Sequence, residues 1–402
     1  MRRVPDRRGF LRGAAAAGIV GLAGCLSGSE EDGSDDAEPD VEPGDPDAGE
    51  DWASFQFDAA NTGRAPGVGP RDEVRERWSF ETDGTVYSSP AVVDDTVYVG
   101  SNDGNVYAIS ADDGSEEWVF PTVDSVSSSP AVVDGTVYVG SQDGNVYAIA
   151  ADDGDERWRF GAGEMVAGSP AVEDDVVYVG SNDGSLYALS ADDGEESWRF
   201  ETDGAMQRAP AIADETAFVG ATDGSLYALD LESGDERWHV ETDDWIQSRP
   251  AVGNGVVYVG SNDNTVYSID AESGDVRWTF QTDGSVTSSP AVLENVVYVG
   301  SFDNRVYALS PEVEETEDGP GNPATFFWEN SGFQQIRSSP AAVGDTVYVG
   351  NGDSNVYAIA ADTGETRWQF STDGAVPSSP AVADGVVYVG SQDGNVYAIE
   401  ES

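Results

Sequence analysis

A unit of forty residues that recurs eight times constrains the fold of this chain more than any other feature. One copy runs from Ser88 to Ser127, and the next opens with Ser128-Ser129-Pro130 and continues through Trp158. A period of this size predicts stacked units, each of which needs its neighbours to bury its apolar face. One proline marks each copy: Pro90, Pro130, Pro170, Pro210, Pro250, Pro290, Pro340 and Pro380.

Each unit has the pattern of four short strands. In the second copy we expect strands at 130–133, 136–141, 145–150 and 157–160, where valine, tyrosine and isoleucine dominate. Asp-Gly pairs separate these runs, and they favour tight hairpins because the glycine accepts a positive φ. Four antiparallel strands per unit predict an all-β fold, an eight-bladed β-propeller of four-stranded antiparallel blades.

The ends of the repeat indicate how the ring closes. Seven units carry a tryptophan in the fourth strand, whereas the eighth ends at Ser402 without one. A separate strand with Trp78 precedes the first proline, so we expect it to close the ring as the outer strand of the eighth blade. The fourth-strand tryptophans are Trp78, Trp118, Trp158, Trp198, Trp238, Trp278, Trp328 and Trp368.

The first residues carry an export pattern. Arg7 and Arg8 lie in a segment that resembles a twin-arginine signal, and the apolar stretch 13–24 is too short to span a bilayer. The sequence Leu-Ala-Gly before Cys25 resembles a lipobox. We therefore expect residues 1–24 to be a signal peptide, Cys25 to be lipidated, and the chain to be anchored to the outer face of the cytoplasmic membrane.

Two further segments precede the repeats. Residues 25–50 are acidic and nearly free of apolar side chains, which predicts a disordered tether. Residues 51–77 contain Trp52, Phe55 and Phe57, and we expect this lead-in segment to cover one end of the propeller. The propeller itself is expected at 78–402.

The repeat resembles a known family. Residues 151–158, Ala-Asp-Asp-Gly-Asp-Glu-Arg-Trp, follow Ser-Pro-Ala-Val and Val-Tyr-Val-Gly-Ser segments, and this order returns in nearly every copy. The pattern resembles the repeat of pyrroloquinoline-quinone-like (PQQ-like) β-propellers, and the lipoprotein signal makes the chain most similar to the BamB-like lipoproteins among them. The resemblance implies an eight-bladed disc in which a tryptophan docks between neighbouring blades; by itself it implies no function.

The charge of the chain is extreme. Acidic residues number 76 against 19 basic residues, all of them arginine, and the net charge is −57. This balance resembles secreted proteins of extreme halophiles, of haloarchaeal type. The Debye length falls from about 10 Å at 0.1 M salt to about 3 Å at 1 M, so concentrated salt screens the self-repulsion. Nucleic acid is not expected as a partner, because it would be repelled.

The residues that usually carry chemistry are scarce. His239 is the one histidine and Cys25 the one cysteine, which excludes Cys/His zinc sites and Cys/His nucleophilic pairs. Quinone-dependent dehydrogenases of the superfamily use adjacent cysteines, which this chain lacks. We expect no catalytic, cofactor or metal site. Six serines repeat with the unit and are expected to be structural: Ser89, Ser129, Ser169, Ser289, Ser339 and Ser379.

Departures from the repeat mark the candidate functional residues. They fall in the connection that enters the first strand of a unit, or in the hairpin between its second and third strands. These two positions share one face, because the first and third strands run in the same direction. Tryptophan and arginine are enriched at interfaces. The candidate partner or anionic-ligand surface, near the central opening, is Gln207, Arg208, Trp245, Gln247, Arg249, Arg305 and Arg337.

One unit is longer than the others. The distance from Pro290 to Trp328 is ten residues longer than in the other units, whereas Trp328 to Pro340 keeps the usual spacing. The insertion therefore lies in the loop between the third and fourth strands of the sixth unit, within 311–325, on the opposite face. Its Gly, Pro and Glu content is typical of a loop, and it replaces the docking loop of that unit.

The sequence is compatible with three functions. The first is a non-enzymatic, membrane-tethered scaffold, expected to be a monomer, that binds an unknown protein partner. The second is a quinone-dependent or sugar-type oxidoreductase that uses the central pocket. The third is a solute-binding lipoprotein.

Overall fold

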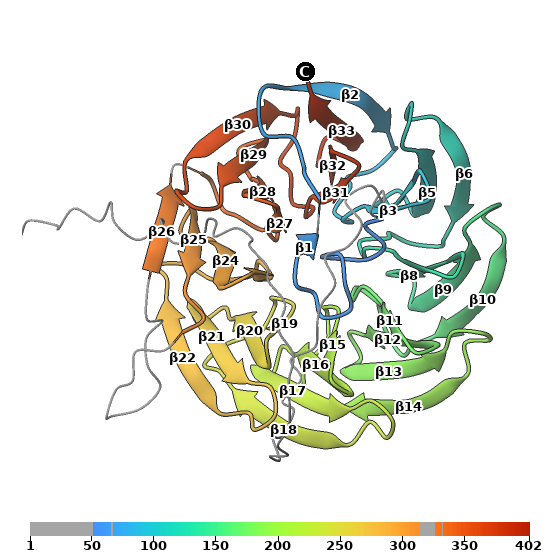
Figure 1. The fold of residues 1–402 in the computed structure, drawn as a ribbon. Coiled ribbons are helices and arrows are strands. Elements are labelled where there is room, and N and C mark those ends of the chain that lie inside the picture. Colours follow the sequence, from blue (N-terminus) through green and yellow to red (C-terminus); the bar gives the residue numbers. More distant parts are fainter. Residues whose placement is uncertain (1–50, 66, 313–325, 332) are drawn as a thin grey trace, which may run out of the picture. The chain divides into compact units, whose positions relative to one another are not determined.

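The computed structural model describes residues 51–402, apart from 66, 313–325 and 332. Residues 1–50, with Arg7, Arg8 and Cys25, lie outside the described residues. Within the described part, the strands form eight sheets arranged as a ring (Figure 1). The predicted all-β, eight-bladed propeller is confirmed. In the same part of the chain, no helix is long and apolar enough to cross a membrane.

The first four blades follow the chain without interruption. Blade one is β3 (Ala91–Val93), β4 (Thr96–Gly100), β5 (Asn105–Ser110) and β6 (Glu116–Pro121); blade two is β7 (Ala131–Val133), β8 (Thr136–Gly140), β9 (Asn145–Ala150) and β10 (Glu156–Gly161); blade three is β11 (Ala171–Glu173), β12 (Val176–Gly180), β13 (Ser185–Ser190) and β14 (Glu196–Glu201); blade four is β15 (Ala211–Ala213), β16 (Thr216–Gly220), β17 (Ser225–Asp230) and β18 (Glu236–Glu241).

The last four blades include two N-terminal strands. Blade five is β19 (Ala251–Gly253), β20 (Val256–Gly260), β21 (Thr265–Asp270) and β22 (Val276–Gln281); blade six is β23 (Ala291–Leu293), β24 (Val296–Ser301), β25 (Arg305–Leu309) and β26 (Phe326–Ser331); blade seven is β27 (Ala341–Val343), β28 (Thr346–Gly350), β29 (Asn355–Ala360) and β30 (Thr366–Ser371), with β1 (Arg64–Ala65) added; blade eight is β31 (Ala381–Ala383), β32 (Val386–Gly390), β33 (Asn395–Glu401) and β2 (Val74–Glu81).

Burial within a blade follows from its position in the ring. The second strand is covered on both faces by neighbouring blades, so every residue of β4 is buried, including Val97 and Val99. The outer strand alternates instead: Trp118 of β6 points inward, whereas Glu117 and Val119 are exposed. At the first hairpin of blade two, Asp134 has a φ of 48° and the glycine after it 67°, as a type I′ turn requires.

Each described outer-strand tryptophan except Trp368 docks onto the next blade, and Trp368 docks onto the lead-in segment. The indole N–H of Trp118 donates to the carbonyl oxygen of Ala151 at 2.9 Å. A Cβ on Gly154 would lie 2.9 Å from that indole ring, so the close approach needs glycine. Corresponding bonds of 2.8 to 3.2 Å are made by Trp78, Trp158, Trp198, Trp238, Trp278 and Trp368.

The long loop of blade six still accepts a tryptophan. Trp278 of blade five is fully buried and donates to the carbonyl oxygen of Pro311, at the start of the insertion. Pro311 therefore still supplies the docking carbonyl of blade six, although the sequence predicts that the insertion replaces the docking loop of this unit. Residues 313–325 and the side chain of Trp328 lie outside the described residues.

Blade eight joins the two ends of the repeat. Strand β2 pairs antiparallel with β33, with Trp78 opposite Ala398. In Figure 1, β2 (blue) forms the outer edge of the last, red blade. This is the arrangement that the isolated Trp78 strand predicts, and it leaves no unpaired outer edge on β33. Because blade eight has no loop between its third and fourth strands, Trp368 docks instead on the carbonyl oxygen of Pro70, at 2.9 Å.

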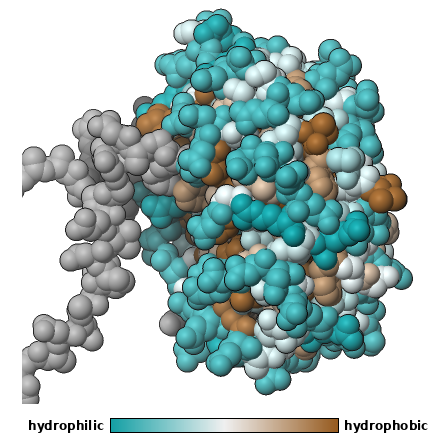
Figure 2. Space-filling view, turned by 90° about the vertical axis from the view of Figure 1, so that its right-hand side faces the viewer, coloured by the Kyte–Doolittle hydropathy of each residue, from teal (hydrophilic) through white to brown (hydrophobic). Residues whose placement is uncertain are grey.

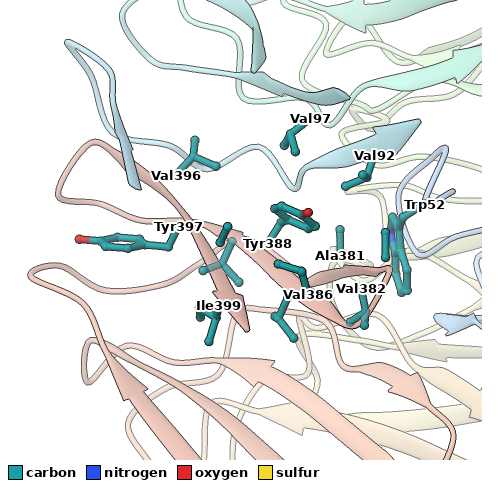
Figure 3. Packing of buried hydrophobic residues seen from close by; sticks show 14 of the residues in the cluster. Trp52, Val92, Val97, Ala381, Val382, Val386, Tyr388, Val396, Tyr397 and Ile399 are labelled. Carbon is teal, nitrogen blue, oxygen red and sulfur yellow. The ribbon is translucent and has the colours of Figure 1, made fainter. Parts of the chain in front are cut away.

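The lead-in segment follows the inner edges of the blades. Its carbonyl groups accept hydrogen bonds from the innermost strands of blades one, two, four, five, six and seven, in that order. The bond from Val92 to Trp52 is the first, at 2.8 Å, and the bond from Ala342 to Gly63 is the last, at 2.7 Å. Figure 3 shows Trp52 packed beside Val92 and Val382, so its indole joins blades one and eight. The segment thus supplies partners to inner edges that would otherwise be unpaired.

The outside of the ring is strongly hydrophilic. Figure 2 shows a side of the propeller covered mostly by hydrophilic residues, with only isolated hydrophobic ones. This side of the propeller therefore offers no broad apolar area of the kind that marks an interaction site.

Candidate functional site

A cavity of about 570 Å³ lies on the axis of the propeller, and we call it the axial cavity. All eight connections that enter a first strand contribute to its wall, which therefore draws on every blade. The lining residues are Phe55, Tyr87, Ser89, Asn102, Ser127, Ser129, Gln142, Met165, Ala167, Asn182, Gln207, Arg208, Gln247, Arg249, Thr287, Ser289, Phe302, Arg337, Ser339, Pro377 and Ser379.

A ring of serines holds the wall together. The backbone N–H of Ser89 donates to the hydroxyl of Ser129 in the next blade at 3.0 Å, and Ser129 donates to Ser169 at 2.7 Å. The same bond recurs between blades five and six, six and seven, seven and eight, and eight and one. The repeated serines are therefore structural, because each satisfies a buried N–H of its neighbour.

The ring is interrupted at blades four and five. These blades have Ala209 and Arg249 at the serine position, so neither supplies a hydroxyl. The guanidinium of Arg249 instead reaches Ser169, two blades away, with Nη2 at 2.8 Å from the hydroxyl. Its Cζ lies 3.3 Å from the ring centroid of Phe55, a cation–π contact. Arg249 is only 6% exposed.

Two more arginines line the same cavity. Arg208 is half-buried, and Arg337 is exposed with its Cζ 5.4 Å from the ring centroid of Phe302. Burial lowers the pKa of Arg208 and Arg249, and a neighbouring positive charge lowers it further: Arg337 for Arg208, and Arg208 for Arg249. The three guanidinium groups therefore raise the positive potential of one another's surroundings.

No described carboxylate compensates this charge. Among the described residues that line the axial cavity none is acidic, although the chain has 76 acidic residues. Arg208, Arg249 and Arg337 form no ion pair within residues 51–402 as described. Arginines on the outer strands do pair: Arg237 lies 2.8 Å from Asp230. The axial cavity is therefore a positive site in a strongly negative protein.

The structure divides the residues that sequence symmetry singled out. Five of the seven line the axial cavity: Gln207, Arg208, Gln247, Arg249 and Arg337. The other two lie outside it. The side chain of Trp245 is 51% exposed in the entry connection of blade five, and Arg305 binds Asp283 at 3.2 Å.

The entry connections also carry exposed apolar side chains. Of the seven large hydrophobic residues that are exposed in the described part of the chain, four lie in these connections. They are Tyr87 of blade one, Val123 of blade two, Met165 of blade three and Trp245 of blade five, exposed by 37 to 87%. We call this set the apolar rim.

Several residues that line the axial cavity do not break the symmetry of the repeat. Asn102, Gln142 and Asn182 recur as amides in the hairpin between second and third strands, so they do not stand out as departures from the repeat. Phe55 was assigned to a cover, and it is also a wall of the cavity. The repeat does not predict that Phe55 contacts Arg249, because Phe55 belongs to the lead-in segment, which is not part of the repeat.

The remaining polar repeats serve the fold. In every blade the tyrosine of the third strand donates to the aspartate of the preceding hairpin, for example Tyr187 to Asp183 at 2.6 Å. His239 is partly exposed and bonds Glu236, which raises the pKa of the imidazole. The described residues contain no group of three His, Cys, Asp or Glu side chains arranged to hold a metal ion.

Comparisons with known proteins agree with the fold. The family described as outer membrane protein assembly factor BamB matches residues 72–159, 120–245, 240–315 and 322–402. BamB from Moraxella catarrhalis is similar in structure, with a TM-score of 0.70 and 21% identity over 82% of this chain and 100% of that one. A comparison with curated protein sequences finds no match.

Enzymes share the same architecture. Quinohemoprotein alcohol dehydrogenase from Comamonas testosteroni has a TM-score of 0.72 at 17% identity, over 87% of this chain and 80% of that one. A europium-containing methanol dehydrogenase has a TM-score of 0.71 at 14% identity, over 90% of this chain and 98% of that one. At these identities the likeness concerns the fold alone.

Proposed function

Because the chain belongs to the family of the outer membrane protein assembly factor BamB, we propose that it is a non-enzymatic propeller scaffold that binds a protein partner. The partner docks on the face that carries the entry connections. The scaffold is exported and held at the outer side of the cell membrane by a lipid on Cys25.

The apolar rim is the observation that carries this proposal. Its four side chains stand on one face, in the connections of blades one, two, three and five, while the side wall in Figure 2 is largely hydrophilic. Exposed aromatic and methionine side chains are enriched at protein interfaces. A partner that covers this face would also lie over the axial cavity, which is lined by Arg208, Arg249 and Arg337.

The tether is supported by the sequence alone. Arg7 and Arg8 support export by a twin-arginine route, and the lipobox before Cys25 supports lipidation. The acidic segment 25–50 would extend away from an anionic membrane surface, because its charges and those of the lipid repel. Metabolic labelling with a radioactive precursor of the host's membrane lipid chains tests the anchor. Label on the parent and none on a Cys25→Ser variant is expected; equal label on both, or no label on the parent, would contradict it.

The docking proposal is tested by capture from membranes in molar salt with the full chain. The rim variant carries Met165→Ser and Trp245→Ser, and we expect it to lose the proteins that the parent captures reproducibly. Val119→Ser is the matched control, since Val119 is 43% exposed on outer strand β6, away from the rim. Capture of the same proteins by parent, control and rim variant would refute a docking face at the rim.

A quinone-dependent or sugar-type oxidoreductase is the second candidate. The axial cavity and the likeness in fold to quinohemoprotein alcohol dehydrogenase favour it. Incubation with pyrroloquinoline quinone and calcium, followed by dye reduction with alcohols and sugars, separates the two. Turnover that is lost in an Arg249→Ser variant would replace the scaffold proposal with an enzyme.

A further inference from the structure

We propose that the axial cavity binds a small molecule bearing a carboxylate or phosphate group, and that Arg208 and Arg249 hold this group. The inference goes beyond partner docking, because it concerns the arginines inside the cavity; of the apolar rim, only Tyr87 and Met165 also line the cavity.

The first argument is that two arginines each have a buried guanidinium nitrogen without a hydrogen-bond partner. Nη1 of Arg249 and Nε of Arg208 are buried and have no hydrogen-bond partner among the described residues. Burying a charge or an N–H donor without a partner is costly, so native structures rarely leave one alone. Water in the cavity would accept these hydrogen bonds but would leave the positive charge uncompensated, and the described lining holds no carboxylate. An anion that enters from outside is the partner that satisfies both the donors and the charge.

The second argument is that Arg249 stands where the fold asks for serine. Six blades have a serine at this position, and its hydroxyl accepts the N–H of the preceding blade. Arginine gives up that bond and adds a buried charge, so it is a poor choice for stability. A contact with a bound anion explains why arginine occupies this position, because binding of the anion compensates the buried charge.

The third argument is that the guanidinium of Arg249 is already oriented. Its Nη2 is held by Ser169 at 2.8 Å, and its plane lies against Phe55. Both contacts leave Nη1 free to donate. A fixed donor loses little conformational freedom on binding, and guanidinium groups bind carboxylate and phosphate oxygens in two-point geometry.

The other residues that line the cavity indicate what the ligand carries besides its acidic group. Asn102 and Asn182 each present a buried side-chain oxygen without a hydrogen-bond partner in the described structure. Such oxygens accept hydrogen bonds from hydroxyl groups. A volume of about 570 Å³ lies within the range of about 300 to 1,000 Å³ that is usual for small-molecule sites. We therefore infer a hydroxylated acid or a phosphorylated hydroxyl compound.

The test uses the full chain in molar potassium chloride and three probes. Citrate represents a hydroxylated carboxylate, inorganic phosphate represents the phosphate group, and glucose is the uncharged reference. Calorimetric titration is expected to show saturable binding of citrate or of phosphate and none of glucose. Binding of citrate alone identifies a carboxylate ligand, and binding of phosphate alone identifies a phosphate ligand.

Variants assign the binding to the arginines. Arg208→Gln and Arg249→Ser are each expected to weaken binding of the probe by about tenfold or more, because each removes a charged donor. Arg199→Gln is the control, since Arg199 is exposed on β14 and pairs with Glu201 at 3.2 Å. Its affinity for the probe should equal that of the parent.

A stability measurement keeps the test independent of folding. Without probe, Arg249→Ser should melt at or above the temperature of the parent, because it restores a hydroxyl for the N–H of Ala209 and removes a buried charge. Phosphate and citrate stabilise proteins in general by exclusion from their surface. The measured quantity is therefore the rise in melting temperature that either anion causes in the parent beyond the rise that it causes in the variant. If neither anion binds the parent, or if the Arg208→Gln/Arg249→Ser double variant binds as tightly as the parent, the proposal is wrong.

Discussion

Replacing Trp78 with alanine tests whether the N-terminal strand holds the ring together. The side chain is only 7% exposed, its indole N–H bonds the carbonyl oxygen of Ala111 at 2.8 Å, and its ring packs against Gly114. Burial of about 200 Å² at about 25 cal/mol per Å² gives about 5 kcal/mol as an upper value. Measured tryptophan-to-alanine changes in cores cost about 3–5 kcal/mol, so we take about 4 kcal/mol.

The corresponding shift in melting temperature follows from the size of the domain. Unfolding entropy is about 2.1 cal/mol/K per residue, or about 0.7 kcal/mol/K for about 350 residues. A loss of about 4 kcal/mol therefore lowers the melting temperature by about 5 to 6 °C. Circular dichroism in molar salt measures it.

Two further variants decide what that shift means. Trp158→Ala removes an equally buried docking tryptophan within a continuous part of the repeat, and Trp245→Ala removes an exposed one. Trp78→Ala should lower the melting temperature at least as much as Trp158→Ala, since it also loosens strand β2 from β33. A Trp78→Ala protein that melts with the parent, or no lower than Trp245→Ala, would refute the reasoning.

Three other predictions follow from the structure. Gly114→Ala should lower the free energy of unfolding by about 1–3 kcal/mol more than Gly255→Ala, as measured by chemical unfolding. Both glycines have a positive φ, but a Cβ at Gly114 would lie 2.8 Å from Trp78, whereas a Cβ at Gly255 would meet open space. Equal losses would contradict the docking geometry. Burial and the hydrogen bonds to hairpin aspartates raise the pKa of Tyr107 and Tyr147 to about 12. These phenols therefore stabilise the folded protein below pH about 10, and they lose that contribution as the pH rises through about 12. Ultraviolet titration should show a phenolate transition near pH 12 that moves to about 10 in denaturant, and a transition at about 10 in the native protein would contradict this prediction. With a net charge of −57, the protein should lose its cooperative melt in dilute buffer and regain it in molar salt; a sharp melt at low salt would show that repulsion does not limit stability.

Much of the fold was predictable because the repeat is local. Strand, turn and docking tryptophan lie within forty residues, so periodicity alone indicates the number of blades and the turns between strands. The isolated Trp78 strand and the incomplete last unit together indicate how blade eight is assembled. The sequence also indicates the arginines that break the symmetry, since a departure stands out against seven similar copies.

The grouping of those arginines depended on tertiary structure. Arg305 and Arg337 both break the repeat on the same face, yet Arg305 pairs with Asp283 outside the axial cavity and Arg337 lines it. Position within a unit predicts the face of the propeller, but the distance from the axis depends on which way each long side chain turns.

The central contact of the candidate site belongs to no single unit. Arg249 meets Ser169 from two blades away and Phe55 from the lead-in segment, nearly two hundred positions earlier in the chain. By itself, the sequence determined how many blades form and what joins each blade to the next, because those interactions repeat. Only the closed ring decided which residues meet on its axis, because closure brings together side chains that no periodicity relates.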